Sequence, residues 1–392
     1  MSWSTVRADQ FCTLITDGTH DSPKPQQSGW KLITSKHLKG HYIDFDSANW
    51  ISEADYLKVI SRSAVEQWDI LFSMIGTIGN IYLEKNPHVE YACKNMGIFK
   101  FSGNKENALW MYYYLKSPQA KAYIQTHLRG STQAYVPLGG LREMPVPVPP
   151  QSVRNEIIAV LRPIDEKIEC NNAINDNLYE MVNAYYTLLF KDVECEMTTI
   201  GNYAERIYSG GTPTTSNAAY WDGAFGWFSS GETRNRFVIS TEKTITQAGI
   251  DNSSTKLAAK HDIVMASAGQ GFTRGQTSML LIDTYVNQSV IVIHAERKVL
   301  PYLFWNLANR YEELRAISDS SSIRGSLTTK MIAAFEIPLA NEESLQAFAD
   351  FSWSVIPQIE NNLLENERLA ALRDNLLPKL MSGEIDVSAV QL

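Results

Sequence analysis

The sequence predicts two α/β (α+β) globular domains in a pseudo-two-fold repeat, separated by two long helices that form a coiled coil, which we expect to be antiparallel. Three observations predict this fold class. An apolar seam of helical spacing runs from about Val153 to Phe190, a second seam follows 191 residues later, and a globular segment precedes each seam. The expected divisions are 1–150 for the first domain, 151–195 for the first helix, 196–340 for the second domain, and 341–392 for the second helix and tail.

The first globular segment mixes β-like and helical patterns. Short β-like runs at 30–34, 68–75 and 96–101 alternate with turn signals, and one helical pattern covers 107–128. The segment ends in Pro145-Val-Pro-Val-Pro-Pro, which excludes a helix and predicts a stiff, extended link to the long helix.

The first long helix is predicted by apolar residues whose steps alternate between four and three. A helix of roughly 35 residues would be roughly 50 Å long and would need a partner to cover its seam. Asn171 and Asn175 interrupt the seam at its middle. The apolar seam positions are Ile157, Leu161, Ile164, Ile168, Leu178, Val182, Tyr185 and Leu189.

The partner is the second seam, in which both asparagines reappear as Asn362 and Asn366. Buried asparagines fix helix register, because an amide facing a leucine would lack a hydrogen-bond partner. An antiparallel pair places Asn171 opposite Asn366 and Asn175 opposite Asn362, whereas a parallel pair would also match asparagine with asparagine. Pro163 and Pro357 predict a kink or a restart in their helices.

The second globular segment repeats the order of patterns of the first, with different residues. His261–Met265 corresponds to Trp68–Phe72, and Arg324-Gly-Ser corresponds to Arg129-Gly-Ser. The helices keep a constant offset while the globular segments drift by several residues. Two similar scaffolds with divergent surfaces suit the recognition of two different targets at a fixed separation.

Charge and cysteine content bound the class of protein. The chain has a net charge of −8, but the acidic excess lies on the two helical segments, and the two globular segments together are slightly basic. Four scattered cysteines without metal spacing indicate free thiols in a reducing compartment. Without a long apolar run or a signal peptide, we expect a cytoplasmic protein that does not contact a membrane.

No catalytic residue and no metal ligand is predicted. An amino-methyltransferase needs an Asn/Asp-Pro-Pro-aromatic motif, which Asn86-Pro-His does not match, and the glycine turns at 76–79 and 269–271 lack the Lys-Ser/Thr of a phosphate loop. Asp17, His20 and Asp21 could suggest a metal or acid–base site, but a capped surface turn fits them better.

Several motifs resemble the specificity (S) subunit of Type I restriction–modification systems. Ser209-Gly-Gly-Thr-Pro, followed by Tyr220-Trp-Asp-Gly and Trp227, looks like the start of that family's target recognition domain. Ile337-Pro-Leu and Lys379-Leu-Met-Ser-Gly-Glu-Ile look like its central and distal spacer regions. The resemblance covers nearly the whole chain, although the first domain has Asp17-Gly-Thr-His-Asp-Ser-Pro in place of the glycine motif.

This resemblance implies a subunit of a phage-defence complex that has no chemistry and no cofactor of its own. It implies double-stranded DNA and two modification subunits as partners, which use S-adenosylmethionine to methylate adenine N6, and restriction subunits that are ATP-dependent translocases and nucleases. Each recognition domain would read half of a split, asymmetric site, with the helix pair as a ruler. The acidic outer faces of the helices and their proline-flanked ends are the expected docking surfaces.

The expected DNA contacts are polar and basic side chains in the loops of the two domains. Any one of them could instead be a solvated surface residue, and the amides near apolar runs could pin the local fold. The candidates in the first domain are Lys31, Ser35, Lys36, His37, Lys39, Arg62, Thr77, Lys94, Asn95, Arg129 and Gln133. Those in the second are Thr212, Arg234, Asn235, Arg236, Gln270, Thr273, Arg274, Gln276, Asn287, Gln288, Arg324 and Lys330.

Two alternative functions stay open at this point. A coiled-coil scaffold or adaptor without DNA specificity would tolerate charge reversal at Arg234, Arg236 and Arg274. A self-contained DNA-modifying enzyme, a methyltransferase or nuclease, would bind its cofactor without a partner subunit.

Overall fold

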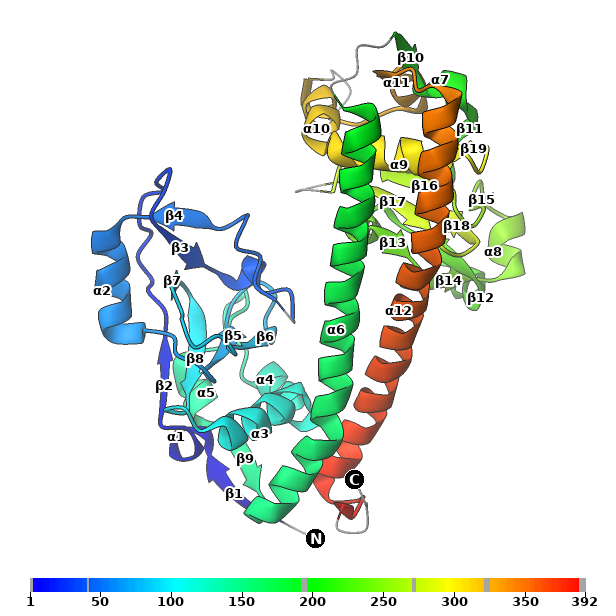
Figure 1. Ribbon diagram of the computed structural model, residues 1–392. Helices are drawn as coiled ribbons and strands as arrows, with labels where there is room; N and C mark the ends of the chain where they lie inside the picture. The colour runs from blue at the N-terminus through cyan, green and yellow to red at the C-terminus, as the bar shows by residue number, and fades with distance from the viewer. Residues whose placement is uncertain (1–2, 41, 192–195, 270–272, 321–324, 388–392) are drawn as a thin grey trace. The chain divides into compact units, whose positions relative to one another are not determined.

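The computed structural model describes residues 3–40, 42–191, 196–269, 273–320 and 325–387 (Figure 1). The chain divides into two compact units. Unit 1 comprises residues 1–169 and 368–392, and unit 2 comprises residues 170–367. Each unit contains one globular domain and a segment of each long helix. In the described ranges, no helix is long and apolar enough to cross a membrane.

The domain of unit 1 is built from two main sheets. The four-stranded sheet has the order β2-β8-β5-β6 with antiparallel neighbours, and the three-stranded sheet has the order β4-β3-β7, in which β3 and β7 are parallel. The strands are β2 (Leu14–Asp17), β3 (Trp30–Ile33), β4 (Asn49–Ile51), β5 (Ile70–Ser73), β6 (Ile81–Leu83), β7 (Tyr91–Cys93) and β8 (Met96–Lys100); the helices are α1 (Ala8–Phe11), η1 (Ser35–His37), α2 (Glu53–Ser63), α3 (Lys105–Lys116), α4 (Pro118–Thr126) and α5 (Leu138–Glu143).

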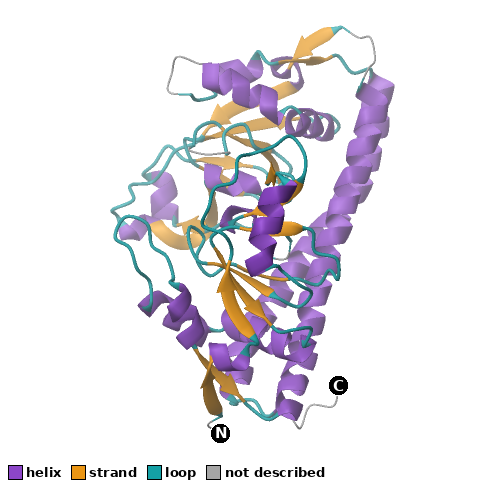
Figure 2. Ribbon diagram, turned by 90° about the vertical axis from the view of Figure 1, so that its left-hand side faces the viewer, coloured by secondary structure: helices purple, strands orange, loops and turns teal. Residues whose placement is uncertain are grey.

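The proline-rich link is extended, as predicted, and is a strand. β9 (Pro145–Val148) pairs antiparallel with β1 (Ser4–Arg7), with Val146 opposite Val6, next to the N-terminus (Figures 1 and 2). Proline has no N–H, so a strand with a proline at every second position can pair on one side only. This explains why the pair stays a two-stranded ribbon.

The prediction of one helix over 107–128 was wrong, because the structure has two helices there. α3 ends at Lys116, and Ser117 is extended, with φ −69° and ψ 154°. Its hydroxyl then accepts a hydrogen bond from Ala120 N at 3.3 Å and caps α4, which begins at Pro118. Proline disfavours a helical residue before it and suits the first position of a helix. The Ser-Pro pair therefore ends one helix and starts the next.

Unit 2 repeats this arrangement with larger sheets. Its main sheets have the orders β11-β19-β16-β17-β13 and β14-β12-β18-β15, and β10 (Met197–Thr199) pairs with β20 (Glu336–Pro338) as β1 pairs with β9. The other strands are β11 (Ala204–Ser209), β12 (Trp221–Phe228), β13 (Phe237–Val238), β14 (Lys243–Ile245), β15 (Lys256–Ala258), β16 (Ile263–Ala266), β17 (Thr277–Leu280), β18 (Thr284–Val286) and β19 (Val290–Ala295). The helices are α7 (Ile200–Tyr203), η2 (Ala218–Tyr220), η3 (Ser230–Arg234), α8 (Gln247–Asp251), α9 (Leu300–Asn309), α10 (Tyr311–Ser320) and α11 (Thr329–Ala333).

The predicted correspondence between Trp68-Asp69 and His261-Asp262 is confirmed in the backbone. Trp68 and His261 both have positive φ, at 71° and 79°. Each donates its N–H across to the neighbouring strand, at 2.6 and 2.7 Å. Asp69 and Asp262 are both buried, and each accepts a backbone N–H three residues earlier in the chain, at 2.8 and 2.9 Å. The two domains therefore share a frame that extends to individual hydrogen bonds.

Groups of neighbouring aromatic residues contribute to both cores. Tyr112, Tyr113 and Tyr114 belong to the main core of unit 1, and Phe304 and Trp305 belong to that of unit 2. Both cores include side chains from the long helices, α6 (Gln151–Phe190) and α12 (Glu342–Ser382). Burial of these helix faces fixes the helices to the domain in each unit.

The two long helices pair antiparallel, as expected, and in the predicted register. In unit 2, Asn171 Nδ2 donates to Asn366 Oδ1 at 2.9 Å, and Asn362 Nδ2 donates to Asn175 Oδ1 at 2.8 Å. In unit 1, Arg373 donates to Asp165 at 2.8 Å, one residue from the position that the same register places opposite Arg373. Neither helix is interrupted at its proline, so neither restarts there.

We expect the loss of one asparagine of a pair to destabilise the protein more than the loss of both. Asn175→Leu leaves the Asn362 amide, which is 5% exposed, without its acceptor, and should lower the free energy of unfolding by about 1–3 kcal/mol. Urea unfolding followed by tryptophan fluorescence measures this. Asn175→Leu with Asn362→Leu should recover most of the loss, and Asn177→Leu, at an exposed position of α6, is the control. A double variant no more stable than the single one would contradict the pairing.

Candidate nucleic-acid interface

In each domain four loops meet at one edge of the sheets, and we call this edge the loop face. In unit 1 it comprises residues 17–23, 34–40, 74–80 and 94–95, and in unit 2 residues 209–213, 229–236, 267–269 with 273–276, and 287–289. In unit 1 these loops follow β2, β3, β5 and β7, and in unit 2 they follow β11, β12, β16 and β18. We call residues 17–23 and 209–213 the glycine loops.

Hydrogen bonds to backbone carbonyl groups join the loops of unit 1. Thr19 N donates to Cys93 O at 2.9 Å, which ties the glycine loop to the end of β7. Lys94 N donates to Ile33 O at 2.9 Å, and Thr77 Oγ1 donates to Ser35 O at 3.4 Å. The loop 129–135 lies beside the β5–β6 loop, because Val136 N donates to Met74 O at 2.9 Å.

Unit 2 joins its loops through equivalent bonds. Gly211 N donates to Val286 O and Asn287 N donates to Phe228 O, each at 3.1 Å. Ser267 N donates to Ser289 O at 2.9 Å, and Leu327 N donates to Ser267 O as Val136 donates in unit 1. The residues that make equivalent bonds can therefore be matched between the two loop faces, although the side chains differ.

Gly18 and Gly210, the first glycine of each glycine loop, lie where the backbone passes close to another strand. A Cβ on Gly18 would collide with the carbonyl oxygen of Cys93, and a Cβ on Gly210 would collide with that of Val286. The first domain thus keeps the glycine that the geometry requires, in spite of its different motif.

The turns that follow β3 and β12 are each capped by a side chain, but the capping residue differs between the domains. His37 Nδ1 accepts the Thr34 N–H at 2.8 Å, and Glu232 Oε1 accepts the Ser229 N–H at 2.8 Å. Burial lowers the pKa of His37, which favours the neutral imidazole that this bond needs. These caps hold Lys36 and Arg234 at exposed positions of the turns.

The loop face brings together most of the predicted DNA contacts. Lys31 lies within β3, Arg62 on α2, Arg129 and Gln133 beside the β5–β6 loop, and Lys330 on α11. Gln270 and Arg324 lie outside the described residues. The predicted contacts on the two loop faces are Ser35, Lys36, His37, Lys39, Thr77, Lys94, Asn95, Thr212, Arg234, Asn235, Arg236, Thr273, Arg274, Gln276, Asn287 and Gln288; of these, Ser35, His37 and Asn287 are buried.

Several predicted cations contact the protein itself. Arg62 donates to Gly18 O at 2.9 Å and so holds the glycine loop. Arg274 pairs with Asp319 at 2.5 Å, and its side chain is 16% exposed. The guanidinium of Arg236 lies 4.2 Å from the ring centroid of Tyr179 on α6. These partners are remote in sequence, so no local motif indicates the contacts.

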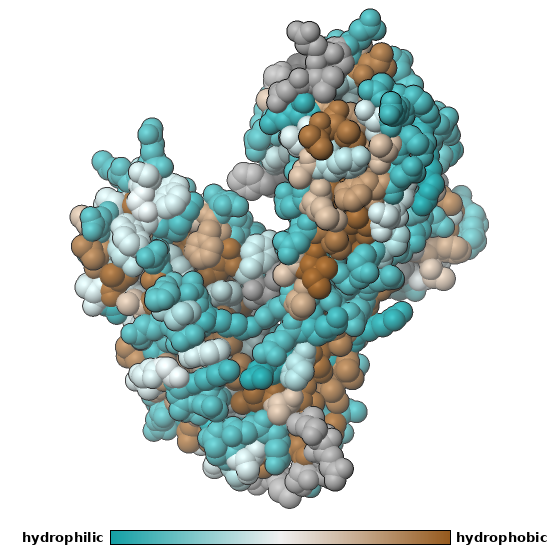
Figure 3. Space-filling model, in the orientation of Figure 1, coloured by the Kyte–Doolittle hydropathy of each residue, from teal (hydrophilic) through white to brown (hydrophobic). Residues whose placement is uncertain are grey.

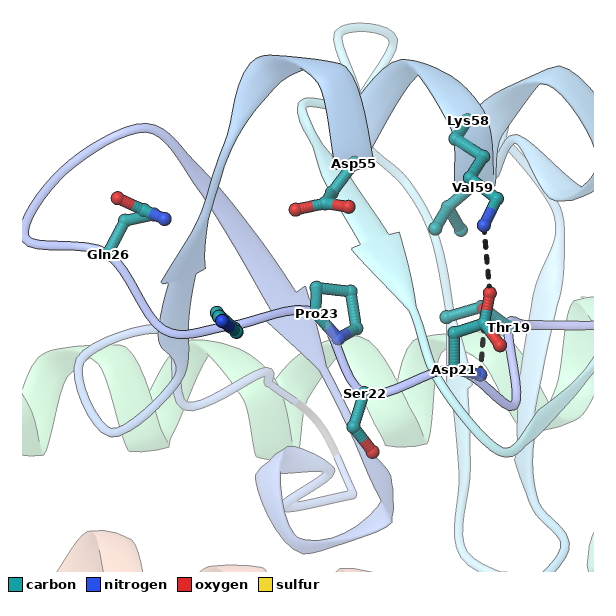
Figure 4. Close-up of a pocket in the computed structure, with 9 residues that line it drawn as sticks. Thr19, Asp21, Ser22, Pro23, Gln26, Asp55, Lys58 and Val59 are labelled. Carbon is teal, nitrogen blue, oxygen red and sulfur yellow. Dashed lines mark hydrogen bonds and ion pairs between the residues drawn. The ribbon is translucent and has the colours of Figure 1, made fainter.

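The glycine loop of unit 1 carries a polar cluster that the sequence did not assign to DNA contact. Figure 4 shows the segment from Thr19 to Gln26 running past α2, with Lys58 directed at Asp21. Lys58 Nζ donates to Asp21 at 3.0 Å, and Asp21 N donates to Thr19 Oγ1 at 3.1 Å. In the part of the chain that the structure describes, no group of three or more His, Cys, Asp or Glu residues is placed to hold a metal ion.

Comparison with known proteins identifies the family. Residues 3–180 and 193–367 each match the family described as Type I restriction modification DNA specificity domain. The specificity subunit of the Escherichia coli Type I enzyme EcoR124I/EcoR124II is 24% identical over 259 residues, 63% of this chain and 63% of that subunit, so the chain spans under two thirds of its length. The specificity subunit of the Haemophilus influenzae Type I enzyme HindI is 19% identical over 417 residues, 86% of this chain and 90% of that subunit.

The fold is shared with a solved structure. The crystal structure of a Type I restriction–modification S subunit from M. genitalium matches with a TM-score of 0.55 at 16% identity, over 97% of this chain and 96% of that chain. Together, the two matched stretches cover most of the sequence and include both globular domains. The chain belongs to the family of Type I restriction modification DNA specificity domains.

Proposed function

We propose that the chain is the DNA-recognition subunit of a Type I restriction–modification complex. Each loop face reads one half of a bipartite, asymmetric site, and the helix pair sets the gap between the halves. The chain binds no cofactor; a modification subunit supplies S-adenosylmethionine and methylates adenine N6. Restriction subunits join the complex as further partners.

One observation carries this proposal. Backbone bonds at matched positions hold the loops of the two loop faces together in the same way, while the side chains on them differ from one face to the other. A common frame with divergent side chains is what two readers of different base sequences need, because frame contacts position a protein on the duplex and side-chain contacts specify bases. A scaffold that binds only proteins gives no reason for this pattern.

Exposed lysines of the first loop face should contribute the electrostatic part of binding. Lys36 and Lys39 are both exposed, on the turn after β3. Replacing both by alanine should weaken binding to all DNA sequences alike and reduce the slope of log K against log salt by about two. Fluorescence anisotropy across a salt series measures this. Lys105→Ala, at the other end of β8 from the loop face, is the control, and an unchanged slope in the double variant would argue against contact here.

Exchange of one domain should change one half-site alone. Residues 201–340 are replaced by those of a relative with known specificity, with both long helices kept. We expect methylation, mapped by sequencing, to move to a hybrid site in which one half and the gap are retained. Loss of all methylation in a folded, assembled hybrid would contradict the proposal that each domain recognises one half-site independently.

The modification subunits require a docking surface, and α6 offers one in unit 2. Ile174, Met181 and Leu188 recur every seven residues and are 39%, 44% and 75% exposed. Figure 3 shows apolar side chains interrupting the hydrophilic surface along α6 there. Leu372, 191 residues after Met181, is 48% exposed on α12 in unit 1. An exposed apolar stripe on a helix fits an apolar partner groove better than water. The stripe in unit 2 would bind one modification subunit, and Leu372 marks the equivalent position for the second.

Charges in this stripe should prevent assembly. We expect Met181→Glu with Leu188→Glu to abolish copurification of the modification subunit at unit 2 and to leave the urea unfolding midpoint of the chain within error. Thr187→Glu, at an exposed position on another face of α6, should assemble normally. Normal methylation by the double variant would place the docking surface elsewhere.

A further inference from the structure

The two glycine loops occupy equivalent positions in the two domains, and so do the turns that follow β7 and β18, at 94–95 and 287–288. Their side chains can therefore be matched between the domains. Thr19 and Gly211 donate to the last residue of equivalent strands, so the next residues, His20 and Thr212, are equivalent. Lys94 and Asn287 donate to the carbonyls of Ile33 and Phe228, so Asn95 and Gln288, which follow them, are equivalent.

Within each domain, a contact between side chains joins the residue of the glycine loop to the residue that follows the equivalent strand. In unit 1 His20 Nδ1 lies 2.9 Å from Asn95 Oδ1. In unit 2 Thr212 Oγ1 donates to Gln288 Oε1. The residue types differ, but both domains hold a side-chain amide at this turn with a polar partner from the glycine loop. The sequence does not show this, because the partners are 75 and 76 residues apart.

The amides are accessible and their orientation is fixed. Gln288 is exposed, and Asn95 is partly exposed on a turn where its φ is 54°. In unit 1 the imidazole is fixed in turn by Asp17, whose carboxylate lies 2.9 Å from His20 Nε2. Asp17 is 14% exposed and also lies 3.5 Å from Arg62. A chain of contacts therefore runs from α2 through the glycine loop to the amide.

A side-chain amide with a fixed orientation suits the reading of a base edge. The side-chain amide of Asn or Gln can form a bidentate contact with adenine, in which the amide NH2 group donates to N7 and the amide oxygen accepts from N6–H. A partner on the amide oxygen leaves the NH2 group and one oxygen lone pair for this purpose. Without the partner, the amide could turn over and present its groups in the reverse order.

We propose that Asn95 and Gln288 each read an adenine edge in the major groove, one per half-site, and that His20 and Thr212 are the positioning residues that orient them. This inference rests on the proposed function and assigns it a matched readout position in each domain. It adds His20 to the residues that determine specificity.

The test uses the full chain assembled with its modification subunit. The wild-type site is first defined by methylation sequencing, and each base of it is then varied in a competition binding assay. Gln288→Ala should reduce discrimination about 10- to 100-fold at one base pair of one half-site, and Asn95→Ala should do so at one base pair of the other half-site. All other positions should keep their preference.

The positioning residues are tested by matched substitutions. Thr212→Val, which keeps the shape and removes the donor, should relax the same base pair as Gln288→Ala, and Thr212→Ser, which keeps the hydroxyl, should retain discrimination. In unit 1 His20→Ala should relax the Asn95 position, and His20→Asn, which keeps a donor near the site of Nδ1, should restore part of it. A combined Thr212→Val and Gln288→Ala variant should be no worse than Gln288→Ala.

The outcomes separate this inference from the proposed function. A wild-type complex without any bipartite site would overturn the proposed function. A wild-type complex with such a site, in which Asn95→Ala and Gln288→Ala weaken all sequences evenly or change nothing, would overturn the inference alone.

Discussion

The antiparallel register of α6 and α12 is the constraint on which the rest of the structure depends. In unit 2 it is set by two amide pairs, Asn171 with Asn366 and Asn175 with Asn362, whose partners would be lost in any shifted register. In unit 1 the same register brings Arg373 to Asp165. Burial alone would raise the pKa of Asp165, but Lys116 and Arg373 outweigh it and hold this pKa below its usual value. Each domain core then closes over the helix faces that this register presents.

The two domains keep geometry rather than residue identity. A buried histidine caps one turn and a buried glutamate caps the other, and the side chain that contacts the buried aspartate is Lys100 in one domain and His294 in the other. Substitutions of this kind are tolerated because each preserves a donor or an acceptor at the required point. The loop face is thereby free to change its outward side chains while its backbone stays in place.

The sequence predicts those features whose signal lies within one stretch or repeats at a fixed offset. The helix pair and its register follow from asparagines that recur after 191 residues, and the shared strand start follows from the matching runs at Trp68 and His261. The break at Ser117-Pro118 was missed because the apolar pattern continues through it. The contacts of Arg62, Arg274 and His20 could not be predicted, because their partners come from other strands or helices and only the fold brings them together.

The measurement that tests the central claim most directly is a genome-wide map of adenine methylation in cells with and without this gene. If the chain reads a split site with one domain for each half, its removal should abolish methylation at one bipartite motif, two short blocks separated by a fixed gap. Unchanged adenine methylation, in cells that express the modification subunit, would contradict the account and favour a scaffold that has no part in DNA recognition.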